Sequence, residues 1–109
     1  MHEEGFQWLT ENHRIEVNKD EQRRVVACGG TLARACVGGR ERGPLRAWPG
    51  GVACARSIGD ADCGAIISAV PALSTLSYPE RGAALVICSD GVWDTLPPDA
   101  ISRAAAGFG

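Results

Sequence analysis

Hydrophobic and polar positions in the first half of the chain predict a helix followed by a hairpin. Good helix formers surround Val25 and Val26 in residues 18–28, and Gly29 and Gly30 then supply a stop where a left-handed backbone costs little. Apolar residues alternate loosely in residues 31–37, as they do in a strand. The stretch "GGRERG" is then expected to be a turn or exposed loop, with residues 44–48 as the returning strand.

The second half combines extended chain with a closing helix. Residues 65–78 are expected to be extended and interrupted at Pro71, because proline cannot donate to a strand ladder. The continuous apolar run at residues 83–88 predicts a central strand that reaches Ser89 and is covered on both faces. Two prolines followed by Asp99 favour a helix over residues 97–106. Together these elements predict an α+β layered fold.

Composition bounds the class of protein. The chain has 109 residues, enough for one modest domain, and its net charge of -2 comes from 11 basic and 13 acidic residues. Basic residues are not concentrated in any segment, so we expect no nucleic-acid partner. The N-terminus lacks the basic and apolar regions of a signal peptide, and no apolar run approaches the ~20 residues of a membrane span. We expect a soluble intracellular protein, cytoplasmic or nuclear, with an organelle not excluded.

The five cysteines do not indicate a metal or disulfide framework. They are odd in number, form no Cys-x-x-Cys pair, and are accompanied only by His2 and His13. Small buried thiols in a reducing compartment are the expected interpretation.

The stretch "SDGVWD" places two carboxylates directly after the apolar run. If residues 90–94 form one helical turn, Asp90 and Asp94 project from the same side and repel each other unless a cation lies between them. Magnesium and manganese prefer oxygen ligands, so the pair is a plausible half-site. The alternative is that Asp90 caps the turn and Asp94 is a solvated surface charge.

Several motifs, in order along the chain, resemble the C-terminal half of the metal-dependent protein serine/threonine phosphatases of type 2C. These are "LTENH", with Asn12 where aspartate is usual, "EQRRV" with "ACGG", "GPLRAW", "GVACARSIGD" and "SDGVWD". The resemblance covers nearly the whole chain. It implies a β-sandwich flanked by helices, with two magnesium or manganese ions at one end.

By the same resemblance, the metals lower the pKa of a bridging water, which attacks a phosphoserine or phosphothreonine without a covalent enzyme intermediate. Asp90 matches a ligand of the core metals, and Asp94 matches a residue of a further, weaker metal position. Asp60, although within a family motif, is expected to organise a buried turn with Arg56 rather than to bind metal. Trp93 is expected to be a core anchor beneath the site.

Two departures from the family pattern affect the functional interpretation. The chain contains no "DGHGG", whose aspartate bridges both metals in the family, and no closing Asp-Asn pair. No catalytic residue is therefore assigned, and residues 1–109 are interpreted as a partial phosphatase domain, inactive alone. Either the chain is a piece of a phosphatase, or it is a catalytically inactive subunit with a structural or binding role. In both cases a protein partner is expected to cover an open sheet edge.

Overall fold

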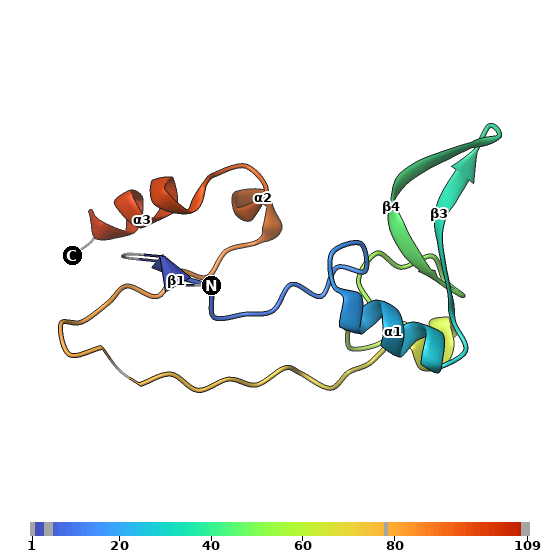
Figure 1. Ribbon diagram of the computed structural model, residues 1–109, viewed down its shortest axis with the longest axis horizontal. Coiled ribbons are helices and arrows are strands. Elements are labelled where there is room, and N and C mark those ends of the chain that lie inside the picture. The colour runs from blue at the N-terminus through green and yellow to red at the C-terminus, as the bar shows by residue number, and fades with distance from the viewer. Residues whose placement is uncertain (1, 4–5, 78, 108–109) are drawn as a thin grey trace. The chain divides into compact units, whose positions relative to one another are not determined.

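A computed structural model describes residues 2–3, 6–77 and 79–107. The chain divides into two compact units, residues 11–73 and residues 1–10 with 74–109, and each is described by itself. Its elements are β1 (His2–Glu3), β2 (Phe6–Gln7), α1 (Lys19–Ala27), β3 (Thr31–Val37), β4 (Arg40–Trp48), the 3₁₀ helix η1 (Ala61–Ile66), α2 (Asp90–Trp93) and α3 (Pro98–Ala106) (Figure 1). The mixture of helices and strands agrees with the predicted α+β class.

Helix α1 forms where the sequence predicts it, and both of its ends have a local cause. The Asn18 side chain accepts a hydrogen bond from the backbone N–H of Glu21 at 3.0 Å, which satisfies one of the helix's unpaired donors. Asp20 and Glu21 lie in the first turn, where the helix dipole favours negative charge. After the helix, Gly29 has a φ of 91°, which a residue with a side chain rarely adopts.

Strands β3 and β4 form the predicted antiparallel hairpin, but the returning strand is longer than expected. It begins at Arg40, directly after a two-residue turn in which Gly38 and Gly39 have φ of 59° and 76°. Positive φ at both positions suits a turn that matches the twist of the strands. The prediction that residues 38–43 form a loop was therefore wrong beyond the two glycines. An irregularity between Arg34 and Ala35 in the register absorbs the extra residues of β4.

The core of the unit formed by residues 11–73 lies between α1, the hairpin and η1. Ile15, Val25, Ala47 and Ala55 are fully buried there, together with Cys63 and Ile66. Gly30 permits the close approach of these elements, because a Cβ at this position would lie 2.6 Å from Ile66 and 2.7 Å from Val25. The extended segment expected at 65–78 begins at Ile67, two residues later than predicted, because residues 65 and 66 close η1, and its last residue lies outside the described residues.

In the other unit, the helix expected at 97–106 is confirmed as α3, which begins at Pro98. The strand expected at 83–88 is not formed. This segment is extended, but no backbone ladder joins it to another described residue. Leu85 and Ile87 are 70% and 86% exposed, so the segment is not covered on both faces either. An apolar run defines a strand only when a neighbouring strand is present to pair with it.

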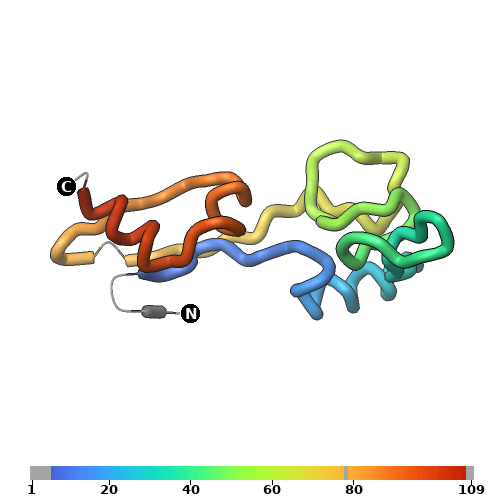
Figure 2. Tube along the Cα trace, turned by 90° about the horizontal axis from the view of Figure 1, so that it is seen from above, coloured from blue at the N-terminus to red at the C-terminus, as the bar shows by residue number. Residues whose placement is uncertain are grey.

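Residues 84–88 lie along α3 in both views (Figures 1 and 2). Together with α3, Val92 and Leu96 they line an apolar groove of about 450 Å³. The side chain of Ile101 is buried. Among the described helices, none is both long and apolar enough to cross a bilayer.

Candidate functional site

The two predicted metal-ligand residues stand at the two ends of one short helical turn. Asp90 is the first residue of α2 and Asp94 is its C-cap, and the Asp94 N–H donates to the Asp90 carbonyl oxygen at 2.8 Å. Both residues are exposed. The structure thus confirms the expected helical spacing of the two carboxylates, while the rigid strand expected to deliver Asp90 is absent from the described residues.

Aromatic packing and hydrogen bonds hold this turn. The indole N–H of Trp93 donates to the carbonyl oxygen of Cys88 at 3.0 Å, which ties α2 to the extended segment before it. The Trp93 ring meets Trp8 edge to face at a centroid distance of 5.0 Å, and Trp8 meets Phe6 in the same way at 5.2 Å. The Thr95 hydroxyl donates to the Gly91 carbonyl at 2.7 Å. Trp93 therefore anchors the turn, but it does so in an aromatic cluster that is only partly buried, rather than in the core as expected.

The ligand set for a divalent cation is incomplete in the part of the chain that the structure describes. Asp90 and Asp94 offer the hard oxygen donors that magnesium and manganese prefer. No group of three or more His, Cys, Asp or Glu side chains among the described residues could hold a metal ion. Asp90 and Asp94 therefore fit as part of a ligand set and do not make a whole one among the described residues.

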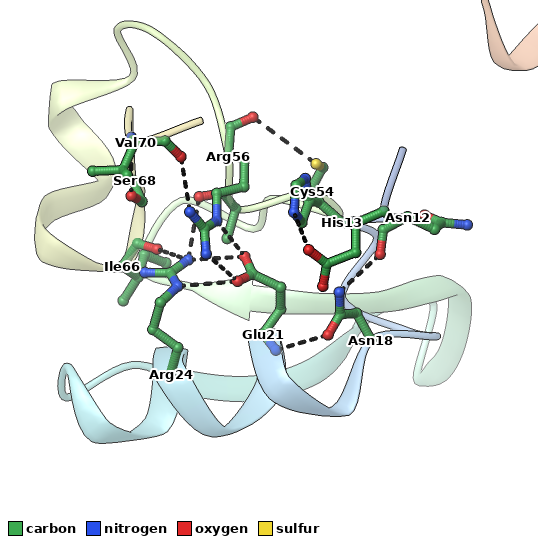
Figure 3. A network of polar contacts seen from close by, with 12 residues as sticks. Asn12, His13, Asn18, Glu21, Arg24, Cys54, Arg56, Ile66, Ser68 and Val70 are labelled. Carbon is green, nitrogen blue, oxygen red and sulfur yellow. Dashed lines mark hydrogen bonds and ion pairs between the residues drawn. The ribbon is translucent and has the colours of Figure 1, made fainter. Parts of the chain in front are cut away.

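A buried ion-pair network, which sequence reasoning did not predict, lies in the unit formed by residues 11–73 (Figure 3). Glu21 on α1 is 3% exposed and accepts two hydrogen bonds from Arg56, at 2.7 and 3.0 Å. Arg24, one turn further along α1, donates to the same carboxylate at 3.1 and 3.3 Å. The arginines also donate to backbone carbonyls of the segment that follows, Arg24 to Ala55 and Ile66 and Arg56 to Val70.

The network fixes the charge of Glu21. Hydrogen bonds from Arg56 outweigh the cost of burial and, with those from Arg24, lower the pKa of the Glu21 carboxyl from 4.5 to about 2. The same carboxylate raises the pKa of Arg56. The guanidinium groups of Arg24 and Arg56 each donate to both carboxylate oxygens of Glu21. Their further hydrogen bonds to backbone carbonyls fix the position of the segment around Arg56. The motifs "EQRRV" and "ARSIGD" contain the three residues, but their spacing in sequence does not show that they meet.

The pairing expected between Arg56 and Asp60 is corrected by this network. Arg56 pairs with Glu21, 35 residues away in sequence. Asp60 is exposed, has a φ of 55°, and accepts a hydrogen bond from the Ser57 hydroxyl at 2.8 Å. It organises a tight surface turn rather than a buried one. The buried carboxylate that pairs with Arg56 belongs to Glu21 on α1.

The cysteines are free thiols in the structure, as expected, but most of them are not buried. Cys28, Cys36 and Cys54 are exposed, and Cys88 is half-buried. Cys63 is buried, and burial raises the pKa of its thiol.

Comparison with known proteins identifies the family. Residues 2–105 match the family model for protein phosphatase 2C. The chain is 46% identical over 101 residues to probable protein phosphatase 2C 5 of Arabidopsis thaliana, covering 92% of this chain and 24% of that protein. It is also 46% identical over 101 residues to probable protein phosphatase 2C 3 of Oryza sativa subsp. japonica, covering 92% of this chain and 21% of that protein. The chain belongs to the protein phosphatase 2C family.

The match has a defined extent. The chain spans about a quarter of the length of the curated relatives that it matches. No solved structure matches it.

Proposed function

We propose that the chain is the part of a protein serine/threonine phosphatase that supplies Asp90 and Asp94 as metal ligands. The complete domain would hydrolyse phosphoserine and phosphothreonine in protein substrates, and residues 1–109 would form part of its β-sandwich. The observation that carries the proposal is the α2 turn, which presents two exposed carboxylates at helical spacing within a chain of this family. The inactive-subunit alternative has no support from the relatives, which are described as probable phosphatases.

Within the proposed site, the chain's own residues position oxygen donors. The Asp90 carbonyl accepts the Asp94 N–H, so the two carboxylates stay one helical turn apart. Trp93 fixes the turn against the preceding segment through Cys88. Magnesium or manganese would supply Lewis acidity toward water and the phosphoryl group. Donors that complete the ligand set would come from outside residues 1–109.

The proposed partner surface is the extended segment before the turn. Leu85 and Ile87 are largely exposed, and no described residue pairs with the backbone of residues 83–88. We expect this segment to become a true strand when another strand, supplied by the remainder of the phosphatase domain, pairs with its edge. That pairing would give Asp90 the rigid support that this structure lacks.

The test is activity of the longer natural protein and of the isolated chain. We expect the transcript or intact mass to reveal a longer product with an upstream "DGHGG", and that product to hydrolyse a phosphothreonine peptide with manganese. Asp90→Asn should lower its kcat/KM by roughly a hundredfold or more, because a lost metal ligand removes several kcal/mol of stabilisation. Asp94→Asn should have a smaller effect.

The matched control is Asp99→Asn, which removes one exposed carboxylate from α3, where it pairs with Arg103. This variant should retain full activity. The isolated 109-residue chain should show no manganese-dependent turnover. Turnover by the isolated chain that disappears in Asp90→Ala would contradict the proposal that the ligand set is completed from elsewhere.

A further inference from the structure

The solvent face of the β3–β4 hairpin carries a row of arginines. The register pairs Ala33 with Arg46, Ala35 with Arg42, and Val37 with Arg40. Directly opposed residues of an antiparallel pair lie on the same face, and alternate residues of one strand share a face. The other face includes Leu32 and buried Ala47 and packs on the core. The three arginines therefore share the face that points away from the core.

Two of these cations are unpaired among the residues that the structure describes. The side chains of Arg40 and Arg42 make no ion pair or hydrogen bond there, and both residues are exposed. Arg46 is half-buried and donates to the Gly51 carbonyl at 2.9 Å. Glu41, the acidic residue next to them in sequence, lies opposite Cys36 on the core side of the ribbon.

The same hairpin shows what an arginine does when a carboxylate is within reach. Arg34 lies on the core side and forms an ion pair with Glu16 at 2.6 Å, while it also donates to the Gly43 carbonyl at 2.7 Å. Pairing thus neutralises the core side and leaves the solvent face cationic, in a chain whose net charge is -2.

We propose that this face, formed by Val37, Arg40 and Arg42, binds an acidic polypeptide segment of a protein partner. Arg40 and Arg42 stand two residues apart on one strand, about 7 Å, which matches the spacing of alternate side chains in an extended peptide. Each guanidinium presents a fork that suits a carboxylate. The exposed Val37 side chain gives the same peptide an apolar contact.

The geometry favours an acidic peptide over nucleic acid. Two unpaired arginines make a short footprint, whereas nucleic-acid binding neutralises a run of phosphates and draws on stacking side chains. Trp48, which shares this face at the Arg46 end, is half-buried and its indole N–H donates to the Ala33 carbonyl at 3.0 Å, whereas the positions opposite Arg40 and Arg42 are Val37 and Ala35. The turn at Gly38 and Gly39 brings Val37 directly opposite Arg40 at the tip of the hairpin (Figure 1).

The test measures binding of a labelled octapeptide with glutamate at every second position to the full chain, immobilised at low density. The reference peptide has glutamine in place of glutamate. We expect the glutamate peptide to bind more tightly, and the Arg40→Gln/Arg42→Gln variant to lose about tenfold in affinity, as expected for two charge-assisted contacts. Added salt should weaken wild-type binding more than it weakens the variant.

Arg81→Gln is the matched control, because it removes an exposed arginine outside the hairpin. It should leave the affinity within about twofold, the range of an isolated surface charge. The proposal is overturned if both peptides bind equally, if Arg81→Gln weakens binding as much as the hairpin variant, or if a single-stranded octanucleotide binds more tightly through Arg40 and Arg42. Far-UV circular dichroism establishes that each variant retains its fold.

Discussion

The two units of the chain differ in how their apolar side chains are buried and in which contacts hold their elements together. In residues 11–73, a helix, a hairpin and a 3₁₀ turn enclose a small apolar core, and Glu21 ties α1 to the segment around Arg56. In residues 1–10 with 74–109, the apolar segment before Asp90 stays exposed, and an aromatic cluster holds the α2 turn. The first unit encloses a core, whereas the second contains an apolar segment that no described strand pairs with. This contrast suggests that the proposed metal ligands depend on chain outside these residues.

The largest expected effect comes from removing the charge at the centre of the closed unit. Glu21→Gln leaves Arg24 and Arg56 without their shared carboxylate, and losing one partner of a buried ion pair typically costs about 3–5 kcal/mol. Urea unfolding followed by circular dichroism should show a correspondingly lower midpoint with an unchanged slope.

Asp20→Asn is the control for this substitution. It breaks a neighbouring i,i+3 pair with Arg23 that is exposed on both sides, so its cost should be below about 1 kcal/mol. Equal destabilisation by the two variants would mean that the buried network is no stronger than a surface pair.

Acid should weaken the same network in a defined pH window. The pKa of Glu21 is lowered from 4.5 to about 2 by folding, so its stabilisation is present above pH 4.5 and is lost as the pH falls toward 2. The shift corresponds to roughly 3 kcal/mol across this window. Unfolding free energies measured through the window should fall more steeply for the wild type than for Glu21→Gln. Parallel curves would show that Glu21 is not the group responsible.

Self-association tests whether the exposed apolar segment at residues 83–88 lacks a partner in the isolated chain. An exposed apolar segment with unpaired backbone is a template for association, so the isolated chain should form oligomers at micromolar concentration in analytical ultracentrifugation. Leu85→Ser/Ile87→Ser should shift the distribution toward monomer. Ile58→Ser, which removes a highly exposed side chain from the first unit, should not. A well-folded wild-type monomer would contradict this prediction.

The smallest effect is expected at the aromatic anchor. Trp93→Phe keeps a ring against Trp8 but removes the N–H that donates to Cys88, a loss of about 1 kcal/mol. Near-ultraviolet circular dichroism should report a loosened aromatic cluster, while α1 and the hairpin retain their stability. Destabilisation of the whole chain to the extent of Glu21→Gln would contradict the local role assigned to Trp93.

Local signals in the sequence predicted local structure. The stop at Gly29, the hairpin around Gly38 and the proline start of α3 are fixed by residues within a few positions, and all three were predicted. The α2 turn, on which the expected carboxylate pair was conditional, also depends on nearby residues. The helical spacing of Asp90 and Asp94 is confirmed, and their role as metal ligands stays a prediction.

What failed depended on residues distant in sequence. The apolar run at 83–88 has strand composition, but pairing is a property of two segments and the second is not among the described residues. Arg56 was assigned to nearby Asp60, whereas tertiary packing brings it to Glu21. No periodicity or spacing reports such a contact, because the helix and the turn that make it are separated by the entire hairpin.

The two-residue turn at Gly38 and Gly39 also has a consequence for the order of folding. A hairpin joined by so short a loop loses little chain entropy on closure and forms in about 1–10 μs, whereas the contact of Glu21 with Arg56 must close a much longer loop. The hairpin is therefore expected to form early and to shorten the effective distance between α1 and the Arg56 segment. We therefore expect the hairpin to fold first and the ion pairs of Glu21 with Arg56 to form afterwards.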